Sequence, residues 1–330
     1  MKHLTNILLF IILISCNSTD KKSDVQHEKP INKYDLRDEW RLYTDDGTSL
    51  FVREFGQGDT VLVLHGGWGA EHSYLIDPFI KLANKYHFIF YDQRGSLRSQ
   101  CPDSLISVDN HIKDVERIRK ATGQDKLLII GHSMGGFLGM SYMDKYPDRV
   151  NGLLLIASAP AKGNVESLTK DIQEPALKRW TRQEVIDTLN AHGLEEQIQD
   201  YFTDKQRGIW HRITFAALNL HHVKNWRKVK SAFFHNGKSG SIAAKSGPQE
   251  WNFTQTLKNA NFPVTVIHGD DDYLPLKYQK GWIHEVPNSE LIVINDAGHL
   301  CWIDRPTKFE DEVQKALKKY KKIKPSPNST

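Results

Sequence analysis

A large excess of charge of one sign, paired cysteines and cofactor motifs are all missing from this 330-residue chain. The 44 Lys and Arg against 40 Asp and Glu leave a net charge of +4, which predicts no nucleic-acid partner. No stretch matches H-E-x-x-H or a pair of cysteine ligands, so no metal site is expected. The composition is otherwise that of a globular protein, and the length suits one large domain with an insertion, or two ordinary domains.

Cysteine is nearly absent, with three residues in the whole chain. Cys16 lies close to the N-terminus, which leaves Cys101 and Cys301 in the body of the protein. Two cysteines do not make a disulfide scaffold, and these two follow strands that we do not expect to be neighbours. We therefore expect both to be free thiols.

The N-terminal residues combine a positive charge with a short apolar run. Lys2 precedes the unbroken apolar residues 8–14, a run too short to span a bilayer and typical of a signal peptide. The run ends Leu13-Ile14-Ser15-Cys16, which resembles the lipobox of bacterial lipoproteins; the alternative is an ordinary secretory peptide with an incidental cysteine. The resemblance implies that residues 1–15 are removed, that Cys16 is lipidated, and that the protein is anchored in the bacterial cell envelope. The polar residues 16–34 would then form a tether.

Short apolar runs alternate with longer amphipathic ones along the rest of the chain. The runs are residues 49–55, 60–65, 87–92, 126–131, 150–157, 263–269 and 291–294. Most are continuous in Val, Ile, Leu and Phe, which is typical of strands covered on both faces. Helical patterns at residues 76–86, 110–121 and 133–146 lie between them. This alternation predicts an α/β fold with a mainly parallel central sheet flanked by helices.

The alternation stops between residues 160 and 256, a segment rich in charge, Trp and His without a strand-like run. It is too long for a loop in a compact domain. We expect a helical cap, or lid, inserted into a core made of residues 35–159 and 257–324. A cap in this place would cover the carboxyl ends of the strands, where open α/β sheets bind ligands.

The residues Gly131-His132-Ser133-Met134-Gly135 fit the motif G-x-S-x-G directly after a predicted strand and at the start of a predicted helix. In this setting the small residues allow a sharp turn that holds the serine hydroxyl out at the strand end. A serine hydroxyl also needs a base. His299 is the candidate, because it follows the last strand and fits the chain order Ser, acid, His.

The acid of the triad is expected in Asp270-Asp271-Asp272, at the end of the penultimate strand. Three adjacent carboxylates cannot all serve, and their repulsion should turn some toward solvent. We choose Asp272 and keep Asp271 in reserve.

The oxyanion of such a reaction needs two backbone N–H donors. One should come from Met134, next to the nucleophile, and the other from Gly67 in the turn His65-Gly66-Gly67-Trp68-Gly69. This turn matches neither G-x-G-x-x-G nor a P-loop, so no nucleotide cofactor is expected.

These elements together resemble the α/β-hydrolase fold over roughly residues 45–320. Within it, the turn at His65 and the loop Tyr91-Asp92-Gln93-Arg94-Gly95 are similar to the HGGPG and YDQRG motifs of the prolyl aminopeptidase (proline iminopeptidase) group. Asp92 and Arg94 are expected to brace this loop. Trp68 departs from HGGPG, Leu97 replaces a glycine, and the GHSMGG elbow is the general hydrolase form.

The resemblance implies a serine hydrolase that cleaves an ester or amide bond through an acyl-enzyme. Two substrate classes stay open, with a slight preference for a short peptide, as in an aminopeptidase, over a small neutral ester, as in a carboxylesterase. A peptidase of this group would hold the free amine with cap carboxylates; the candidates are Glu174, Glu184, Glu195, Glu196 and Glu250. An esterase would need an apolar pocket, which cap aromatics could line unless they form the cap's own core; these are Trp210, Phe215, Trp226, Phe233 and Phe234. A non-catalytic surface binding protein is the remaining alternative, and the oligomeric state stays open.

Overall fold

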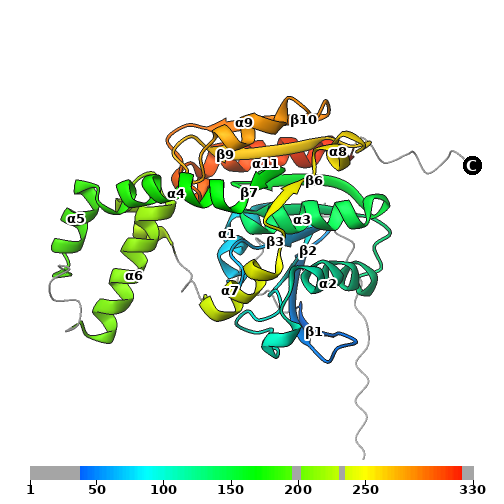
Figure 1. Cartoon of the computed structure of the whole chain (residues 1–330), viewed down its shortest axis with the longest axis horizontal. Coiled ribbons are helices and arrows are strands. Elements are labelled where there is room, and N and C mark those ends of the chain that lie inside the picture. The colour runs from blue at the N-terminus through cyan, green and yellow to red at the C-terminus, as the bar shows by residue number, and fades with distance from the viewer. Residues whose placement is uncertain (1–37, 195–201, 230–234, 322–330) are drawn as a thin grey trace, which may run out of the picture. The chain divides into compact units, whose positions relative to one another are not determined.

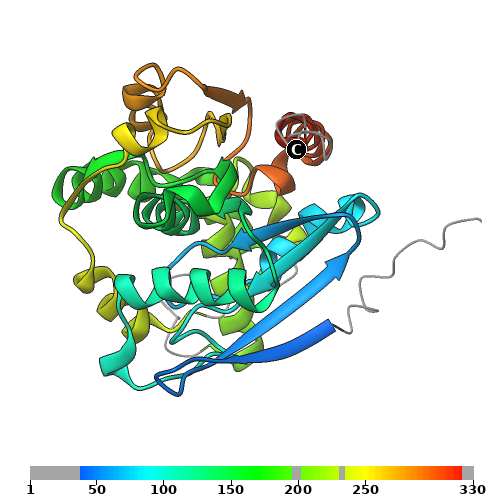
Figure 2. The same ribbon diagram turned by 90° about the vertical axis from the view of Figure 1, so that its right-hand side faces the viewer.

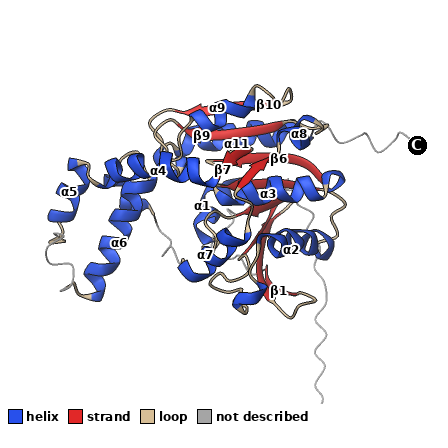
Figure 3. Cartoon of the chain, viewed as in Figure 1, coloured by secondary structure: helices blue, strands red, loops and turns tan. Residues whose placement is uncertain are grey.

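A computed structural model describes residues 38–194, 202–229 and 235–321, all within one compact unit, Ile31–Thr330. Its centre is an eight-stranded sheet with the strand order β1-β2-β4-β3-β5-β6-β9-β10 (Figures 1 and 3). The strands are β1 Asp38–Tyr43, β2 Ser49–Gly56, β3 Asp59–Leu64, β4 Tyr86–Tyr91, β5 Leu127–His132, β6 Val150–Ile156, β9 Val264–Gly269 and β10 Ser289–Ile294. β2 pairs antiparallel with β1 and β4, and all other neighbours in this sheet are parallel. The predicted α/β fold is confirmed.

Alternate residues of the strands enter two separate apolar cores, because successive side chains of a strand point to opposite faces. Val61 and Val63 of β3 belong to one core, and Leu62 and Leu64 belong to the other. The first core also contains residues of α1 (Ile76–Phe79) and α11 (Pro306–Lys321), and the second contains residues of α2 (Val108–Ala121) and α3 (Met134–Lys145). The helices outside the insertion are α1 Ile76–Phe79, α2 Val108–Ala121, α3 Met134–Lys145, α8 Thr254–Lys258, α9 Lys277–Ile283, α10 Cys301–Asp304 and α11 Pro306–Lys321. Helices therefore cover both faces of the sheet, as the continuous apolar strands predicted.

One expectation about local structure was wrong, and one strand was missed. The helix expected at 76–86 is instead the single turn α1 between 3₁₀ turns at Ser73–Leu75 and Ile80–Leu82. No capping side chain supports these turns, and Pro78 lacks the N–H that a longer helix would use. The antiparallel strand β1, which Figure 2 shows at the edge of the sheet, was missed because its sequence DEWRLY is half polar and exposed.

The insertion after β6 is mostly helical but also contains strands, contrary to expectation. Its helices are α4 Val165–Trp180, α5 Gln183–Asn190, α6 Asp204–Asn219 and α7 Gly237–Ser246. Its first and last strands, β7 Lys162–Asn164 and β8 Glu250–Asn252, pair antiparallel and close the base of the insertion. Strands of three residues leave no pattern in a sequence, which is why they were missed. No helix among the described residues is both long and apolar enough to cross a membrane.

Both cysteines in the described part of the chain are free, as expected. Cys301 is buried, and its thiol donates a hydrogen bond to the Gly298 carbonyl at 3.2 Å. Cys16 lies outside the described residues.

Candidate active site

Ser133 lies at the sharp turn between β5 and α3, in a conformation that few non-glycine residues adopt. Its φ of 54° and ψ of −121° fall outside the ordinary L-residue regions. The turn is held in place because the Ser133 N–H donates to the Ile156 carbonyl at 3.0 Å and the Ser133 carbonyl accepts from Ala159 N–H at 3.1 Å. A side chain at Gly135 would meet the Leu64 carbonyl oxygen at 2.1 Å, so this turn requires a glycine there. The strain presents the Ser133 hydroxyl at the carboxyl end of the sheet.

Asp272 and His299 lie in contact, although 26 residues separate them. The Nδ1 atom of His299 is 3.0 and 2.9 Å from the two carboxylate oxygens of Asp272. The side chains of His299 and Asp272 are buried, with exposures of 4 % and 0 %, respectively. Burial raises the pKa of Asp272, but the charge and hydrogen bond of His299 outweigh it and lower that pKa below its usual value. Asp272 is thus a carboxylate that fixes the Nδ1–H tautomer of His299, so that Nε2 is the ring nitrogen that can accept a proton.

The reserve residue Asp271 faces the cap. It forms ion pairs with Arg179 of α4 at 2.7 Å and with the Nδ1 atom of His221 at 2.8 Å. Asp270 instead accepts from the Ala297 N–H at 3.3 Å. The three adjacent carboxylates therefore separate into three environments, and Asp272 alone of them contacts His299 in the described structure.

The turn expected to bind the oxyanion lies directly against Ser133. A Cβ atom at Gly66 would be 2.6 Å from the Cβ of Ser133, so the close approach requires glycine. Gly67 follows with a positive φ of 68°. Met134 is the first residue of α3, where an N–H has no acceptor within the helix. Within the described residues neither the Gly67 nor the Met134 N–H donates a hydrogen bond, so both can serve an oxyanion.

A chain of hydrogen bonds, here called the relay, joins this turn to the loop that carries His299, and no pattern in the sequence predicted it. The hydroxyl of Tyr74 accepts from the Gly66 N–H at 2.7 Å and donates to Nδ1 of His132 at 2.7 Å. Nε2 of His132 is in turn 3.3 Å from the carbonyl of His299. Burial lowers the pKa of His132 well below its usual value, so the ring is neutral, as this chain of donors requires.

The two motifs shared with the prolyl aminopeptidase group pack on each other. Nε2 of His65 accepts from the Gln93 N–H at 3.1 Å, and the Gln93 side chain donates to the His65 carbonyl at 2.9 Å. Arg94 is fully buried and makes two 2.7 Å hydrogen bonds to Asp114. Trp68, where HGGPG has proline, stacks on His111 with the ring centroids 4.8 Å apart.

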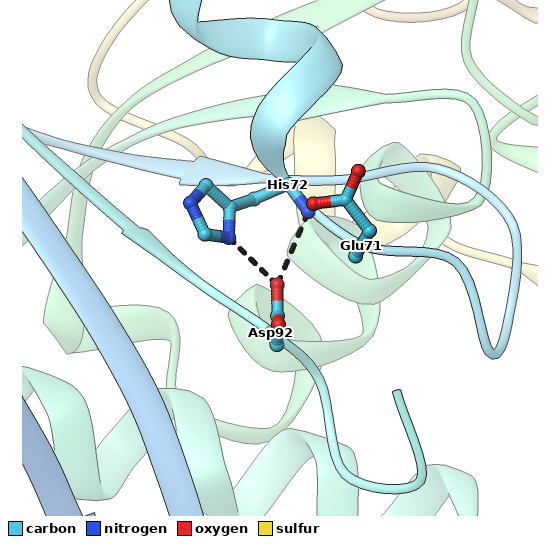
Figure 4. A group of neighbouring side chains, drawn as sticks. All are labelled: Glu71, His72 and Asp92. Atoms are coloured by element: carbon cyan, nitrogen blue, oxygen red, sulfur yellow. Dashed lines mark hydrogen bonds and ion pairs between the residues drawn. The ribbon is translucent and has the colours of Figure 1, made fainter. Parts of the chain in front are cut away.

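Glu71, His72 and Asp92 form a buried cluster behind the turn, with ligand atoms close enough for a metal ion (Figure 4). Asp92 accepts from Nδ1 of His72 at 2.6 Å and from Nε of Arg98 at 2.7 Å. Another nitrogen of Arg98 donates to Glu71 at 2.7 Å. The guanidinium of Arg98 is thus the cation between the two carboxylates. Because Arg98 already pairs with both carboxylates, this donor set does not fit a metal ion as well. Asp92 braces the loop through these contacts.

The cap contacts the loops of the candidate site at several points. The carboxylate of Asp304 accepts from the N–H groups of His221 and Gly298, both at 2.9 Å. His235 hydrogen-bonds the Trp68 carbonyl at 3.0 Å and lines a cavity of about 1030 Å³ between α4, α5 and α6. Trp210 and Phe215, two of the cap aromatics that could line an apolar pocket, also line this cavity. Trp226 is instead buried within the cap, and Phe233 and Phe234 lie outside the described residues.

The sequence profile of the α/β hydrolase fold matches residues 59–306, which is more than half of the chain. The chain belongs to the α/β-hydrolase fold family. A proline iminopeptidase of Saccharolobus solfataricus is 25 % identical over 279 residues, covering 79 % of this chain and 86 % of that protein. One from Flavobacterium johnsoniae is 36 % identical over 142 residues, 39 % of this chain and 48 % of that protein.

Solved structures of the same fold include both esterases and peptidases. A thermophilic esterase from Thermogutta terrifontis superposes with a TM-score of 0.62 at 21 % identity, covering 86 % of this chain and 98 % of that one. The proline iminopeptidase of Mycobacterium smegmatis has a TM-score of 0.61 at 17 % identity, with the same coverage. At these identities the structures show the fold alone. The family and its relatives make this chain a hydrolase.

Proposed function

We propose that this hydrolase cleaves an ester or amide bond through an acyl-enzyme formed on Ser133. The observation that carries the proposal is the buried pair of Asp272 and His299 at the carboxyl end of the sheet, where Ser133 also lies. A carboxylate oxygen of Asp272 is 2.9 Å from Nδ1 of His299. His299 accepts the hydroxyl proton as Ser133 attacks the carbonyl carbon, and the N–H groups of Gly67 and Met134 hold the oxyanion. The leaving group takes the proton from His299, and water then releases the acyl group. A non-catalytic binding protein would not need this arrangement.

The charges of the cap favour a neutral ester as substrate. An aminopeptidase needs a carboxylate for the cationic amine of its substrate. Glu174 is exposed and pairs with Lys178 at 2.6 Å, and Glu250 accepts a hydrogen bond from Asn164 at 2.7 Å. Asp271, the carboxylate next to the triad acid, is already paired with Arg179, so an amine would have to displace that guanidinium.

The cap cavity supports the same substrate class. Its lining residues are mainly apolar and include Leu177, Trp180, Leu189, Ile209, Trp210 and Phe215. Ligand pockets of this composition bind apolar groups and use few polar contacts for orientation. His235, which lines the cavity, hydrogen-bonds the carbonyl of Trp68, the residue after Gly67 in the oxyanion turn. Ser133 itself does not line the cavity in the described structure, and the proposal is that the acyl chain of the substrate extends from Ser133 toward it.

A prolyl aminopeptidase is the second candidate, favoured by the names of the relatives and by the Tyr91–Gly95 loop. Glu184, a third cap carboxylate, is 3.4 Å from the Lys224 N–H. The remaining two, Glu195 and Glu196, lie outside the described residues. They are the first targets for mutation if the protein cleaves peptides.

A paired substrate panel decides between the two. Protein lacking residues 1–20 is assayed on p-nitrophenyl esters and on prolyl- and alanyl-p-nitroanilides, with Ser133→Ala as the blank. Ester cleavage with little anilide cleavage is the expected result. Efficient cleavage of the anilides that requires their free amine would establish the aminopeptidase and refute the ester proposal.

We also propose that the protein is exported and anchored in the bacterial envelope through a lipid on Cys16. The support is the sequence alone, with its apolar residues 8–14 followed by Ser15-Cys16. Cys16→Ser should leave the protein unprocessed and without lipid. Cys101→Ser, which changes a free thiol in the folded core, should be processed and lipidated like the wild type. Intact-mass analysis of the membrane fraction measures this. An unmodified mature N-terminus on the wild-type protein would refute the anchor.

A further inference from the structure

The phenol of Tyr273 contacts both side chains that exchange the proton in the proposed reaction. Its hydroxyl is 3.4 Å from Nε2 of His299, the nitrogen that must accept the proton of Ser133. The same hydroxyl is hydrogen-bonded with the Ser133 side chain. The ring itself packs on the imidazole, with centroids 4.6 Å apart and planes at 42°. Tyr273 directly follows the triad acid Asp272, so the loop that positions the acid also fixes the phenol.

The hydroxyl is a neutral donor at physiological pH. Burial and the charge of Asp272 raise the pKa of Tyr273 above its usual value, and this outweighs the hydrogen bond with Ser133 and the charge of Arg179, which lower it. The phenol therefore keeps its proton while His299 exchanges one. Because Nδ1 of His299 donates to Asp272, the tyrosine hydroxyl faces the side of the ring where the chemistry takes place.

The leaving atom of the substrate must come close to this hydroxyl. To receive a proton it has to lie within hydrogen-bond distance of Nε2 of His299 while still bonded to the carbon that Ser133 attacks. An atom that meets both conditions lies near Ser133 and Nε2 at once, and the Tyr273 hydroxyl, which contacts both of these groups, is therefore close to it. We propose that Tyr273 is a further catalytic residue, whose hydroxyl donates a hydrogen bond to the leaving oxygen or nitrogen. This inference rests on the proposed function of Ser133 and His299.

The step balances without transfer of the phenolic proton. As the tetrahedral intermediate collapses, the oxyanion pair re-forms the carbonyl and the bond from carbon to the leaving atom breaks. The leaving atom keeps that electron pair and takes the proton from Nε2 of His299. Tyr273 donates a hydrogen bond to the same atom as its negative charge develops, and a charge-assisted hydrogen bond of this kind stabilises the transition state more than the ground state.

The experiment compares two leaving groups on one acyl group in Tyr273→Phe, a change that removes only the hydroxyl. A p-nitrophenolate leaves readily without help, whereas an alkoxide needs its charge neutralised. We expect kcat/KM to fall about 10- to 100-fold for an alkyl ester, as for loss of a hydrogen bond to a charged group. For the p-nitrophenyl ester of the same acid the expected fall is under about 3-fold. Equal losses on both esters, or a faster enzyme, would overturn the inference.

Tyr278→Phe is the matched control, because it removes the same atom from the neighbouring helix α9. That hydroxyl donates to Asp171 of α4 at 2.8 Å and contacts neither Ser133 nor His299 in the described structure. Both esters should be cleaved at nearly the wild-type rate. Labelling by a fluorophosphonate separates the two proposals: wild-type protein that does not label at Ser133 contradicts the proposed function, whereas normal labelling with equal losses on the two esters contradicts only the role of Tyr273.

Discussion

Tyr74→Phe tests whether the relay behind the oxyanion turn holds the site in shape. The Tyr74 hydroxyl contacts Gly66 and His132, each at 2.7 Å, and both of these residues are buried. The substitution removes one oxygen and keeps the ring, so apolar packing is nearly unchanged. It leaves the Gly66 N–H without an acceptor and Nδ1 of His132 without a donor.

The expected loss of stability follows from these two groups. A buried polar group that loses its partner costs about 1–3 kcal/mol, so the two together predict roughly 2–6 kcal/mol. The catalytic effect should be smaller than the ~10²–10³-fold loss that follows removal of a whole oxyanion donor. Tyr74 acts on Gly67 only through Gly66, so we expect kcat to fall about 10-fold while KM changes little.

Urea unfolding and steady-state kinetics on the same preparations measure both effects. Tyr91→Phe is the control, because the Tyr91 hydroxyl is also buried but has no partner among the described residues. Its removal should leave the free energy of unfolding unchanged within about 0.5 kcal/mol, or raise it. If the two variants lose the same stability, or if Tyr74→Phe unfolds like the wild type, the relay does not support the turn.

Two further predictions concern the triad acid and the response to pH. Asp272→Asn should lower kcat about 10⁴-fold, because His299 loses its tautomer, whereas Asp271→Asn should cost less than 10-fold; similar losses in the two variants would mean that the acid is misassigned. Burial lowers the pKa of His65 to about 4 and that of His111 to about 3. As the pH falls, these histidines are therefore protonated in the unfolded chain before they are protonated in the folded protein. The stability that is present above pH 6.5 is lost as the pH falls toward 4, by about 1.4 kcal/mol per pH unit for each ring. Urea midpoints that stay constant from pH 7 to 4.5 would contradict this assignment.

The fold and the order of the candidate catalytic groups could be read from the sequence because they depend on local patterns. Continuous apolar runs marked the strands of the parallel sheet, and a glycine-rich turn after a strand marked the position of Ser133. The choice of Asp272 over Asp271 rested on the similarity of Gly269-x-x-Asp272 to the acid loop of the prolyl aminopeptidase group, and the structure places only Asp272 of these two against His299.

The remaining features depend on contacts between distant residues, which leave no local pattern. Tyr74 reaches His132 across 58 positions of the chain. Tyr273 was not predicted as a functional residue, because the acid loop was identified from the aspartates that precede it and not from the tyrosine itself. The strand β7 could not be seen either, since its three residues are defined by pairing with β8, which lies beyond the whole cap. Such features become visible only when both partners have been placed.

The most direct test of the proposed chemistry is the site at which a fluorophosphonate probe reacts. The protein without residues 1–20 is labelled, digested and analysed by mass spectrometry, with Ser133→Ala and His299→Ala in parallel. We predict one adduct, on Ser133, which is absent from Ser133→Ala and forms far more slowly in His299→Ala. An unlabelled wild-type protein, or an adduct on another residue, would contradict the assignment of Ser133 as the nucleophile.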